Sequence, residues 1–533
     1  MKYQKYKNFP VIIIFSSFLI IGILIYGDYG ISWDEYYHRI NGFVSLNFLR
    51  KTFFLDIYPG LEHDSKFLAE SSKMYGVLFD LPMAFIEKKL QIDDPKNYFL
   101  IRHFFNFFIF FIASIFFFLL LKKRFSNKLS IIGLLFLILS PRIFAESFYN
   151  MKDLIFLSFF VISLYFTLNF LDKPSYKNAL LASLACAFVI DVRIVGIISP
   201  FIVIVFFILM CMDNKIFLKK NIFKIITFFC LLIFFTILFW PYLWNEPLVK
   251  FLHILKDMSY HVWTGSVFYF GEHISALNLP WHYPIVWILI TTPIIYLLLF
   301  VLGSFLIIRR LFNRFLNLST KDNFNELWRG NKERMDIIFF IIFYFTIFLV
   351  IELNSVLLNG WRHLYFTYPC IIYISIRGLD FFSKTLSLRY LIILIAPFLL
   401  YTSMWMIKNH PYQFVYFNKF AGEDITNSFD VDYWGVSNKS ALTYIVSNDK
   451  KDRLKIYVSS NSPYHFSSLL MDKNNRKRLK FVNNISDADF LVTNHFYKKG
   501  NPAFINQELK KKFKLFKEFK VDDIIINSIY KIN

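Results

Sequence analysis

The stretch FLIRHFFNFFIFFIASIFFFLLL, residues 99–121, decides the fold class of this chain. A helix of about 20 apolar residues is long enough to cross a hydrocarbon core of roughly 30 Å. Ten more apolar segments occupy residues 9–26, 129–145, 154–171, 179–191, 194–212, 222–241, 285–308, 337–353, 364–377 and 390–407. The sequence therefore predicts a polytopic α-helical membrane protein with about 11 transmembrane helices, the first of them an uncleaved anchor.

Composition excludes the alternative classes. The chain has 533 residues, is 56% hydrophobic and has a mean hydropathy of +0.46, whereas soluble domains are about 45–50% apolar. Its 59 Lys and Arg outnumber 38 Asp and Glu, a formal charge of +21. These bases lie in short runs between apolar segments, as in the loops of membrane proteins, so the charge does not indicate a nucleic-acid partner. All four cysteines fall inside apolar segments, so we expect no disulfide in an exported loop.

Charge also predicts the orientation. Cytoplasmic loops of membrane proteins are enriched in Lys and Arg, and every second short loop of this chain is basic. These loops include residues 2–7, 122–128, 173–177, 215–224, 309–334 and 377–389. With 11 crossings of the plasma (inner) membrane and a cytoplasmic N-terminus, the C-terminus is extracytoplasmic, together with loops 28–98 and 242–284.

The chain is predicted to divide into a membrane module, residues 1–407, and a small α/β domain, residues 408–533. Within the second part, LKIYVSS, DADFLVTN and VDDIIINSIYKI have the composition of strands, and KSALTYIVSN that of a helix. The Lys-rich stretches KNNRKRLK and LKKKFKLFK are interpreted as solvated faces.

Ionisable residues gather at the predicted outer ends of the membrane segments. Such groups are costly at membrane depth and normally face cavities or partners. Any single one can simply mark a helix end, but mixed acids and bases at one rim indicate a polar cavity beside the lipid. The set comprises Asp34, Glu35, Arg102, Arg142, Glu146, Lys152, Asp153, Asp191, Arg193, Glu352, Arg362 and His363.

An acid pair follows the first apolar segment, in GDYGISWDEYYHRI, residues 27–40. A carboxylate just above the bilayer is suited to take a proton from an attacking hydroxyl. Because neighbouring side chains diverge, only one of the two is expected to face the chemistry. We assign Asp34 as the base and Glu35 as an orienting group; the alternative is a solvated loop start.

A second cluster, SPRIFAESFYNMKD, occupies residues 140–153. Arg and Lys at an interface suit a phosphate whose lipid tail stays in the bilayer, although snorkelling gives the same pattern. Two more outer cations stand at Arg193, for which an ion pair with Asp191 is the alternative, and Arg362. The candidate donor phosphate-binding residues are Arg142, Lys152, Arg193 and Arg362, with Arg102, Asn150, Asp153 and His363 as supporting residues.

The sequence offers no metal site. His253, His261, His273 and His282 are separated by 8, 12 and 9 residues, which match no usual ligand spacing. We interpret this loop, which also contains Trp244, Trp263 and Trp281, as an aromatic belt at the interface.

Six motifs together resemble the GT-C fold glycosyltransferases, specifically the bacterial relatives of dolichyl-phosphate-mannose protein mannosyltransferases and of lipid A aminoarabinose transferases. These motifs are SWDE, SPRIFAESFYNMKD, DVRIVG, NGWRHLYFTYP, HPYQFVYFNKFAG and DVDYWGVSNKSA. They cover most of the membrane module and the start of the C-terminal segment.

The resemblance implies an inverting transferase that moves a sugar from a polyprenyl-phosphate donor to a hydroxyl of a lipid, glycan or protein. It implies Asp34 as the catalytic carboxylate and Arg142, Lys152, Arg193 and Arg362 as the residues that hold the phosphate. Some relatives hold a divalent metal near the active site, but no ligand set for one is evident in this sequence. The C-terminal segment is not the beta-trefoil insertion of the eukaryotic enzymes, which puts a protein acceptor in doubt.

Two alternatives stay open at the level of sequence. A lipid-linked sugar flippase or transporter would also have many spans with charges among them, although transporters more often show repeated halves with broken helices near the midplane. A non-catalytic assembly subunit is the other reading, and it would tolerate the loss of Asp34.

Overall fold

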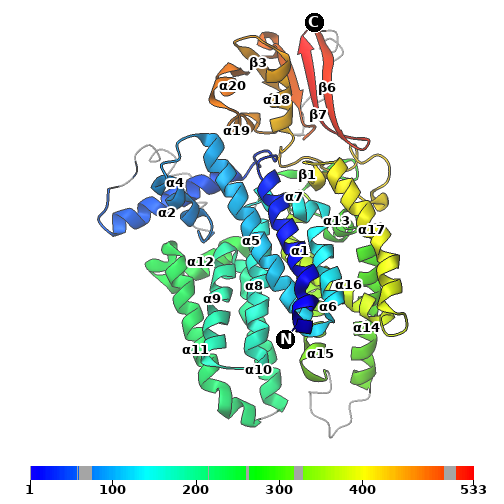
Figure 1. Cartoon of the computed structure of the whole chain (residues 1–533). Helices are drawn as coiled ribbons and strands as arrows, with labels where there is room; N and C mark the ends of the chain where they lie inside the picture. Colours follow the sequence, from blue (N-terminus) through cyan, green and yellow to red (C-terminus); the bar gives the residue numbers. More distant parts are fainter. Residues whose placement is uncertain are drawn as a thin grey trace.

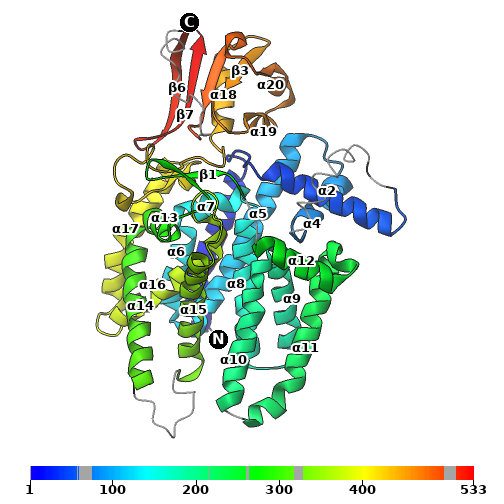
Figure 2. The same ribbon diagram turned by 180° about the vertical axis from the view of Figure 1, so that it is seen from behind.

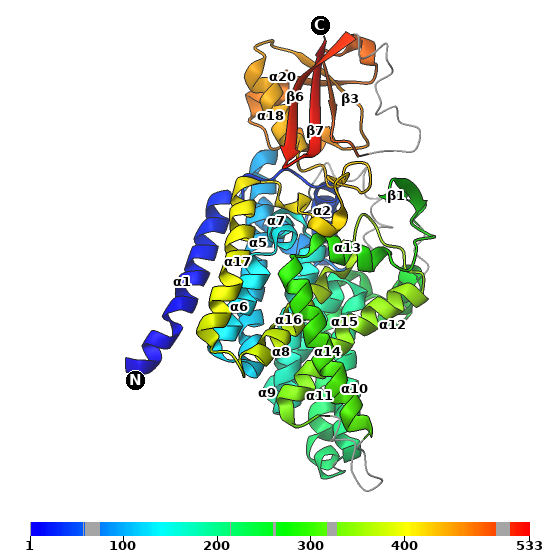
Figure 3. The ribbon, with the colours of Figure 1, turned by 90° about the vertical axis from the view of Figure 1, so that its right-hand side faces the viewer.

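The structure, a computed structural model, describes residues 2–56, 58, 75–213, 215–259, 263–316, 328–496 and 512–532. Figure 1 shows a bundle of helices that carries a smaller domain of strands at one end. The view from behind (Figure 2) and the side view (Figure 3) show the same arrangement, with the C-terminus at the tip of the smaller domain.

Every predicted apolar segment coincides with a helix or a pair of helices. The bundle consists of α1 (Lys2–Ile25), α5 (Pro95–Arg124), α6 (Asn127–Ile138), α7 (Pro141–Tyr149), α8 (Asp153–Asp172), α9 (Tyr176–Val192), α10 (Ile198–Asp213), α11 (Lys215–Phe239), α13 (Tyr283–Thr291), α14 (Ile294–Leu316), α15 (Gly330–Glu352), α16 (Tyr368–Phe382) and α17 (Leu388–Lys408). The short 3-10 helices η2 (Ile194–Ile197) and η5 (Arg362–Thr367) lead into α10 and α16.

Fewer helices meet the length and composition expected of a membrane span than the 11 that the sequence predicts. Among the described residues, seven helices are long and apolar enough to cross a membrane, or eight if the bent pair α6 and α7 forms one span. The three remaining segments also form helices, but the apolar part of α1, Phe9–Ile25, stops short of the 18 residues required. Helices α9 and α16 have only 17 and 15 residues. The coarse class, a multi-pass helical membrane protein, is confirmed.

The bend between α6 and α7 is built into the sequence. The two helices meet at 62° around Ser140 and Pro141. Proline disfavours the helical conformation of the residue before it and is well suited to the first position of a helix. Ser140 is accordingly extended, with φ −89° and ψ 104°, and Pro141 opens α7. As a result α7 turns into the bundle, where all nine of its residues are buried.

Both long loops predicted to be outer lie at the end of the bundle that carries the strand domain (Figures 1 and 2). The first contains α2 (Glu35–Thr52) and α4 (Asp80–Lys89), and the second contains α12 (Pro247–Ser259) and a hairpin of β1 (Ser266–Tyr269) with β2 (Glu272–Ser275). The acid pair, α7 and the C-terminal segment are therefore at one end of the molecule.

The C-terminal part forms a mixed five-stranded sheet with the strand order β4-β3-β5-β7-β6. Strand β3 (Leu454–Val458) pairs in parallel with β4 (Leu479–Val482) and β5 (Phe490–Thr493), whereas β7 (Ile524–Ile532) is antiparallel to β5 and to β6 (Phe513–Val521). Helices α18 (Asn438–Asn448), α19 (Tyr464–Ser468) and α20 (Lys473–Arg478) accompany the sheet. The helix and the three strands predicted from sequence are present.

The two edge strands of the sheet, β4 and β6, were not predicted from the sequence. Part of each lies in a Lys-rich stretch interpreted only as a solvated face. Lys514, Lys517 and Lys520 of β6 are indeed exposed, whereas Phe513 and Val521 at the two ends of the strand are buried. Register shifts between Leu515 and Lys517 and between Phe519 and Lys520 interrupt the alternation. Lysines on an edge strand discourage pairing with another chain. A Lys-rich sequence is therefore compatible with a strand at the edge of a sheet.

The segment after α1 is fastened to the segment before α18. The ammonium of Lys439 donates to the backbone carbonyls of Gly27, Asp28 and Tyr29, and the backbone N–H of Trp33 donates to the carbonyl of Trp434 at 3.2 Å. Gly30 lies so close to Val436 that a Cβ atom at this position would collide with the carbonyl oxygen of Val436.

We expect Gly30→Ala to lower the free energy of unfolding by about 1–3 kcal/mol, because the added methyl group overpacks a backbone contact. The measurement is the apparent melting temperature of the purified protein in detergent. Gly27→Ala is the matched control, since the nearest atom to its Cβ would be Leu100 Cδ2 at 3.8 Å. Equal melting temperatures for both variants would contradict the close approach.

Candidate active site

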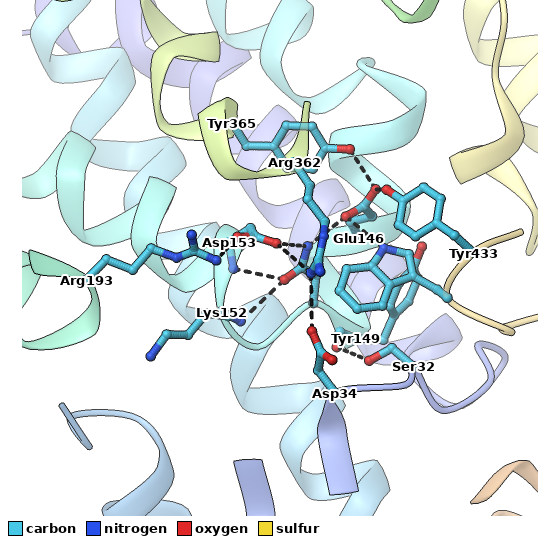
Figure 4. Close-up of polar contacts among 12 residues, drawn as sticks. Ser32, Asp34, Glu146, Tyr149, Lys152, Asp153, Arg193, Arg362, Tyr365 and Tyr433 are labelled. Atoms are coloured by element: carbon cyan, nitrogen blue, oxygen red, sulfur yellow. Dashed lines mark hydrogen bonds and ion pairs between the residues drawn. The ribbon is translucent and has the colours of Figure 1, made fainter. Parts of the chain in front are cut away.

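A network of acids, bases and aromatic side chains lies where α7, α8, η5, the start of α2 and the segment 433–434 meet (Figure 4). Its members come from parts of the chain that are far apart in sequence, and most are fully buried. Buried charges must be paired or hydrogen-bonded to be tolerated, so the contacts of each carboxylate show how the network is organised.

Glu146 of α7 is the buried acceptor at its centre. One carboxylate oxygen, Oε1, accepts hydrogen bonds from the hydroxyls of Tyr365 at 2.7 Å and Tyr433 at 3.4 Å. The other, Oε2, accepts from Asn150 Nδ2 at 2.7 Å and from the indole N–H of Trp434 at 3.3 Å. Four donors satisfy this carboxylate, so Glu146 joins α7, η5 and the 433–434 segment rather than facing a substrate.

Asp153, the first residue of α8, holds two guanidinium groups. Its Oδ1 forms an ion pair with Arg193, and its Oδ2 lies 3.5 Å from Arg362 Nη1 and accepts from Asn150 Nδ2 at 3.1 Å. The Asp153 side chain is only 1% exposed. Arg193 therefore pairs with Asp153 and not with Asp191, whose Oδ1 accepts from the backbone N–H of Leu78 at 2.9 Å.

Arg362 links this buried part to Asp34. Its Nη1 lies 3.2 Å from Asp34 Oδ2, and its guanidinium carbon stacks 4.4 Å from the centre of a Trp434 ring. The Asp34 side chain is 37% exposed, against 9% for Arg362. Asp34 is thus the acid of this network that solvent or a ligand can reach, and Arg362 fixes its direction.

Glu35, the second acid of the pair, turns the opposite way and is completely buried. It accepts from the backbone N–H of Ser32 at 2.6 Å and lies 2.9 Å from Nε2 of His103, which is also buried. The other ring nitrogen of His103, Nδ1, is 3.3 Å from the carbonyl of Tyr26. Glu35 and His103 therefore fasten the turn that carries Asp34 to α5.

Lys152 and Arg142 are the two cations of the network that form no ion pair with a described residue. The ammonium of Lys152 stacks 4.1 Å from the ring centre of Tyr75, and burial lowers the pKa of Lys152 to about 8. Arg142 donates to the carbonyl of Tyr416 at 3.3 Å and stacks near Trp287 and Phe417. The four bases Arg142, Lys152, Arg193 and Arg362 lie among the acids Asp34, Glu146 and Asp153, and Lys152 also interacts electrostatically with Asp80 and Asp191.

Of the remaining sequence candidates, two lie in the network and one lies outside it. Asn150 bridges Glu146 and Asp153, and His363 interacts electrostatically with Asp153. Arg102 is elsewhere: it pairs with Glu87 at 3.5 Å in a separate cluster between α5 and α4. Among the described residues, no group of three or more His, Cys, Asp or Glu is placed to hold a metal ion. His261 of the predicted aromatic belt lies outside the described residues.

Sequence reasoning missed how much of the network is aromatic. Tyr365, Tyr433 and Trp434 all donate to Glu146, yet no aromatic residue other than His363 was among the sequence candidates. The signal was present, because these three residues stand in the motifs NGWRHLYFTYP and DVDYWGVSNKSA.

A helical membrane bundle with carboxylates and cations gathered at one end has the groups needed for group transfer from a lipid-anchored phosphate. Residues 11–254 of the chain match the family described as dolichyl-phosphate-mannose-protein mannosyltransferase. This match confirms the resemblance drawn from the sequence and the class of enzyme: the chain is a membrane glycosyltransferase similar to that family.

No curated protein matches the chain. Among solved structures, the chain is similar to ArnT from Cupriavidus metallidurans bound to undecaprenyl phosphate, with 9% sequence identity, 98% of each chain covered and a TM-score of 0.44.

The four donors on Glu146 predict a graded response to substitution. In Glu146→Gln the new amide can point at the Tyr365 and Tyr433 hydroxyls, which can turn to accept, so we expect a small loss of stability. Glu146→Ala leaves the indole N–H of Trp434 and one of the two N–H groups of Asn150 buried without acceptors, although Asn150 still donates to Asp153, and should cost about 2–5 kcal/mol. Thermal unfolding in detergent checks the order; equal losses for the two variants would contradict Glu146 as the organising acceptor.

Proposed function

We propose that the protein transfers a sugar, with inversion, from a polyprenyl-phosphate donor to a hydroxyl-bearing lipid, glycan or protein at the outer face of the plasma membrane. The observation that carries this proposal is the line Asp34–Arg362–Asp153, in which an accessible carboxylate is held by a guanidinium anchored on a buried carboxylate. The match to a glycosyltransferase family supports the same reaction class.

In this proposal Asp34 is the general base. The acceptor hydroxyl forms a bond to the anomeric carbon, its proton passes to the Asp34 carboxylate, and the bond from that carbon to the phosphate oxygen breaks. The electron pair of the broken bond leaves with polyprenyl phosphate, so no oxidant or further reactant is needed. General bases of this kind typically contribute about 10²–10⁴ in rate.

The departing phosphate is assigned to the neighbouring cations. Cations stabilise the negative charge that develops on a leaving group. Lys152 and Arg142 form no ion pair with a described residue and instead contact the Tyr75 ring and the Tyr416 carbonyl, so an anion can approach either side chain without displacing a carboxylate from it. Arg193 pairs with Asp153, and Arg362 pairs with both Asp153 and Asp34, so we assign these two side chains a role as N–H donors to the same phosphate rather than as a source of net charge.

The topology belongs to the proposal as well. All 11 predicted segments are helical, and we infer that α1, α9 and α16 complete the crossings despite their length. Eleven crossings with a cytoplasmic N-terminus bring Asp34 and the C-terminal domain to the extracytoplasmic face, in keeping with the basic loops at the other end.

Replacement of Asp34 tests the base. We expect Asp34→Asn to reduce sugar transfer by at least about 10²-fold, because an amide cannot take up the proton, while the melting temperature stays within a few degrees. The assay is release of polyprenyl phosphate from labelled polyprenyl-phosphate sugars in the presence of acceptor. Asp472→Asn is the control, since the Asp472 carboxylate is 69% exposed and pairs with Lys96. A fully active Asp34→Asn enzyme would exclude the proposed role, and intact donor in every assay of the native enzyme would favour a flippase.

Lys152 predicts how donor binding depends on pH. The lysine is charged below its pKa of about 8 and neutral above it, so its attraction for phosphate is lost as the pH rises. We expect KM for the donor to increase roughly tenfold from about pH 7 to about pH 9. In Lys152→Arg the guanidinium stays charged, so KM should change little over that range. The same pH dependence in both enzymes would remove Lys152 from phosphate binding.

A further inference from the structure

A groove with a volume of about 360 Å³ runs along the outer side of the C-terminal domain, between α18 and β6. Figures 1 and 3 show these two elements within that domain. Ser440, Thr443, Tyr444 and Ser447 of α18 line it. Their spacing of three and four residues places them on one face of the helix. Phe519 of β6 closes the opposite side.

The chemistry of this face is unusual for a surface helix. Such faces are normally occupied by charged residues, whereas here three hydroxyls and the amide of Asn448 stand beside two aromatic rings. Hydroxyls and amides donate and accept hydrogen bonds, and Tyr presents an apolar ring with a polar tip. Alternating hydroxyl groups and apolar C–H faces are the features of a sugar. The Thr443 hydroxyl and the Asn448 amide each donate one hydrogen bond within α18, and their oxygens remain acceptors for sugar hydroxyls.

One end of the groove adjoins the segment that carries the catalytic candidate. Lys439, which lines this end, donates to the carbonyls of Gly27, Asp28 and Tyr29, and the chain reaches Asp34 five residues later. On the other side of Lys439, Tyr433 and Trp434 contact Glu146. A molecule bound at the Lys439 end of the groove would therefore lie beside the two segments that lead into the site, residues 27–34 and 433–439.

We propose that this groove binds the sugar chain of the acceptor, so that the acceptor is a glycan whose reacting residue extends toward Asp34. The inference rests on the proposed function and narrows its acceptor from lipid, glycan or protein to a saccharide. Lys439 lines the groove, and the Lys517 ammonium lies 5.7 Å from the ring centre of Tyr444 and 5.9 Å from that of Phe519. A neutral sugar chain meets no like-charge repulsion from these cations. The same chain can be carried on a lipid or be free in solution, and both sources present the same hydroxyls to the groove.

Binding is tested first, without turnover. The full-length protein with Asp34→Asn is titrated with a panel of neutral oligosaccharides, free in solution in one arm and attached to a lipid in phosphatidylethanolamine–phosphatidylglycerol nanodiscs in the other. We expect at least one saccharide to bind, and Tyr444→Ala or Ser447→Trp, added to this protein, to weaken binding about tenfold or more. Ser447 is exposed, so tryptophan there fills the groove without entering the core. Phe420→Ala, at a side chain 60% exposed outside the groove, should bind normally.

A sugar-transfer assay distinguishes failure of the groove proposal from failure of the proposed function. With Asp34 intact, the groove variants should raise KM for the acceptor about tenfold and leave KM for the donor unchanged. Failure of the proposed function alone appears as saccharide binding without any transfer. The groove proposal is overturned if no saccharide of the panel binds, if Tyr444→Ala and Ser447→Trp both bind like the parent protein, or if transfer proceeds only to peptides.

Discussion

A carboxylate buried away from water must be surrounded by donors, and this requirement shapes the end of the bundle. Glu146 and Asp153 are both buried, and together they accept hydrogen bonds or form ion pairs with six side chains: Tyr365, Tyr433, Trp434, Asn150, Arg193 and Arg362. Removing one partner of such an arrangement leaves an uncompensated charge. The positions of α7, α8, η5 and the 433–434 segment are therefore set by these two acids, and Asp34 takes its direction from them through Arg362.

The two acids of the Asp34–Glu35 pair show how neighbouring residues acquire different environments. Asp34 is the residue just before α2 and Glu35 is its first residue, so their side chains leave the helix in different directions. Glu35 is enclosed by Ser32 and His103, whereas Asp34 stays accessible. Burial of one acid stabilises the turn, and exposure of the other leaves a carboxylate free to react.

Much of this arrangement follows from the sequence, because the cost of placing charge near lipid confines ionisable residues to a few positions. Arg142, Lys152, Asp153, Arg193 and Arg362 were selected on that ground, and the structure brings them together. The partner of each charged residue could not be predicted. The short distance along the chain suggested an ion pair between Arg193 and Asp191, but Arg193 pairs with Asp153. Arg102 pairs with Glu87, outside the network. Hydropathy located the helices, but it cannot state whether a short one such as α16 crosses the bilayer. Strand β6 was not predicted because its lysines and its register shifts break the alternation of polar and apolar residues that identifies a strand.

The backbone hydrogen bond between Trp33 and Trp434 sets an order on biosynthesis. Chains grow at about 5–20 residues per second, so roughly 20 to 80 seconds separate the emergence of the two tryptophans. Until the later one arrives, Glu146 lacks two of its four donors, and the turn bearing Asp34 is held only by its contacts with earlier segments, such as that of Glu35 with His103. A polypeptide that ends before Tyr433 would therefore lack two of the four donors that satisfy the buried carboxylate of Glu146.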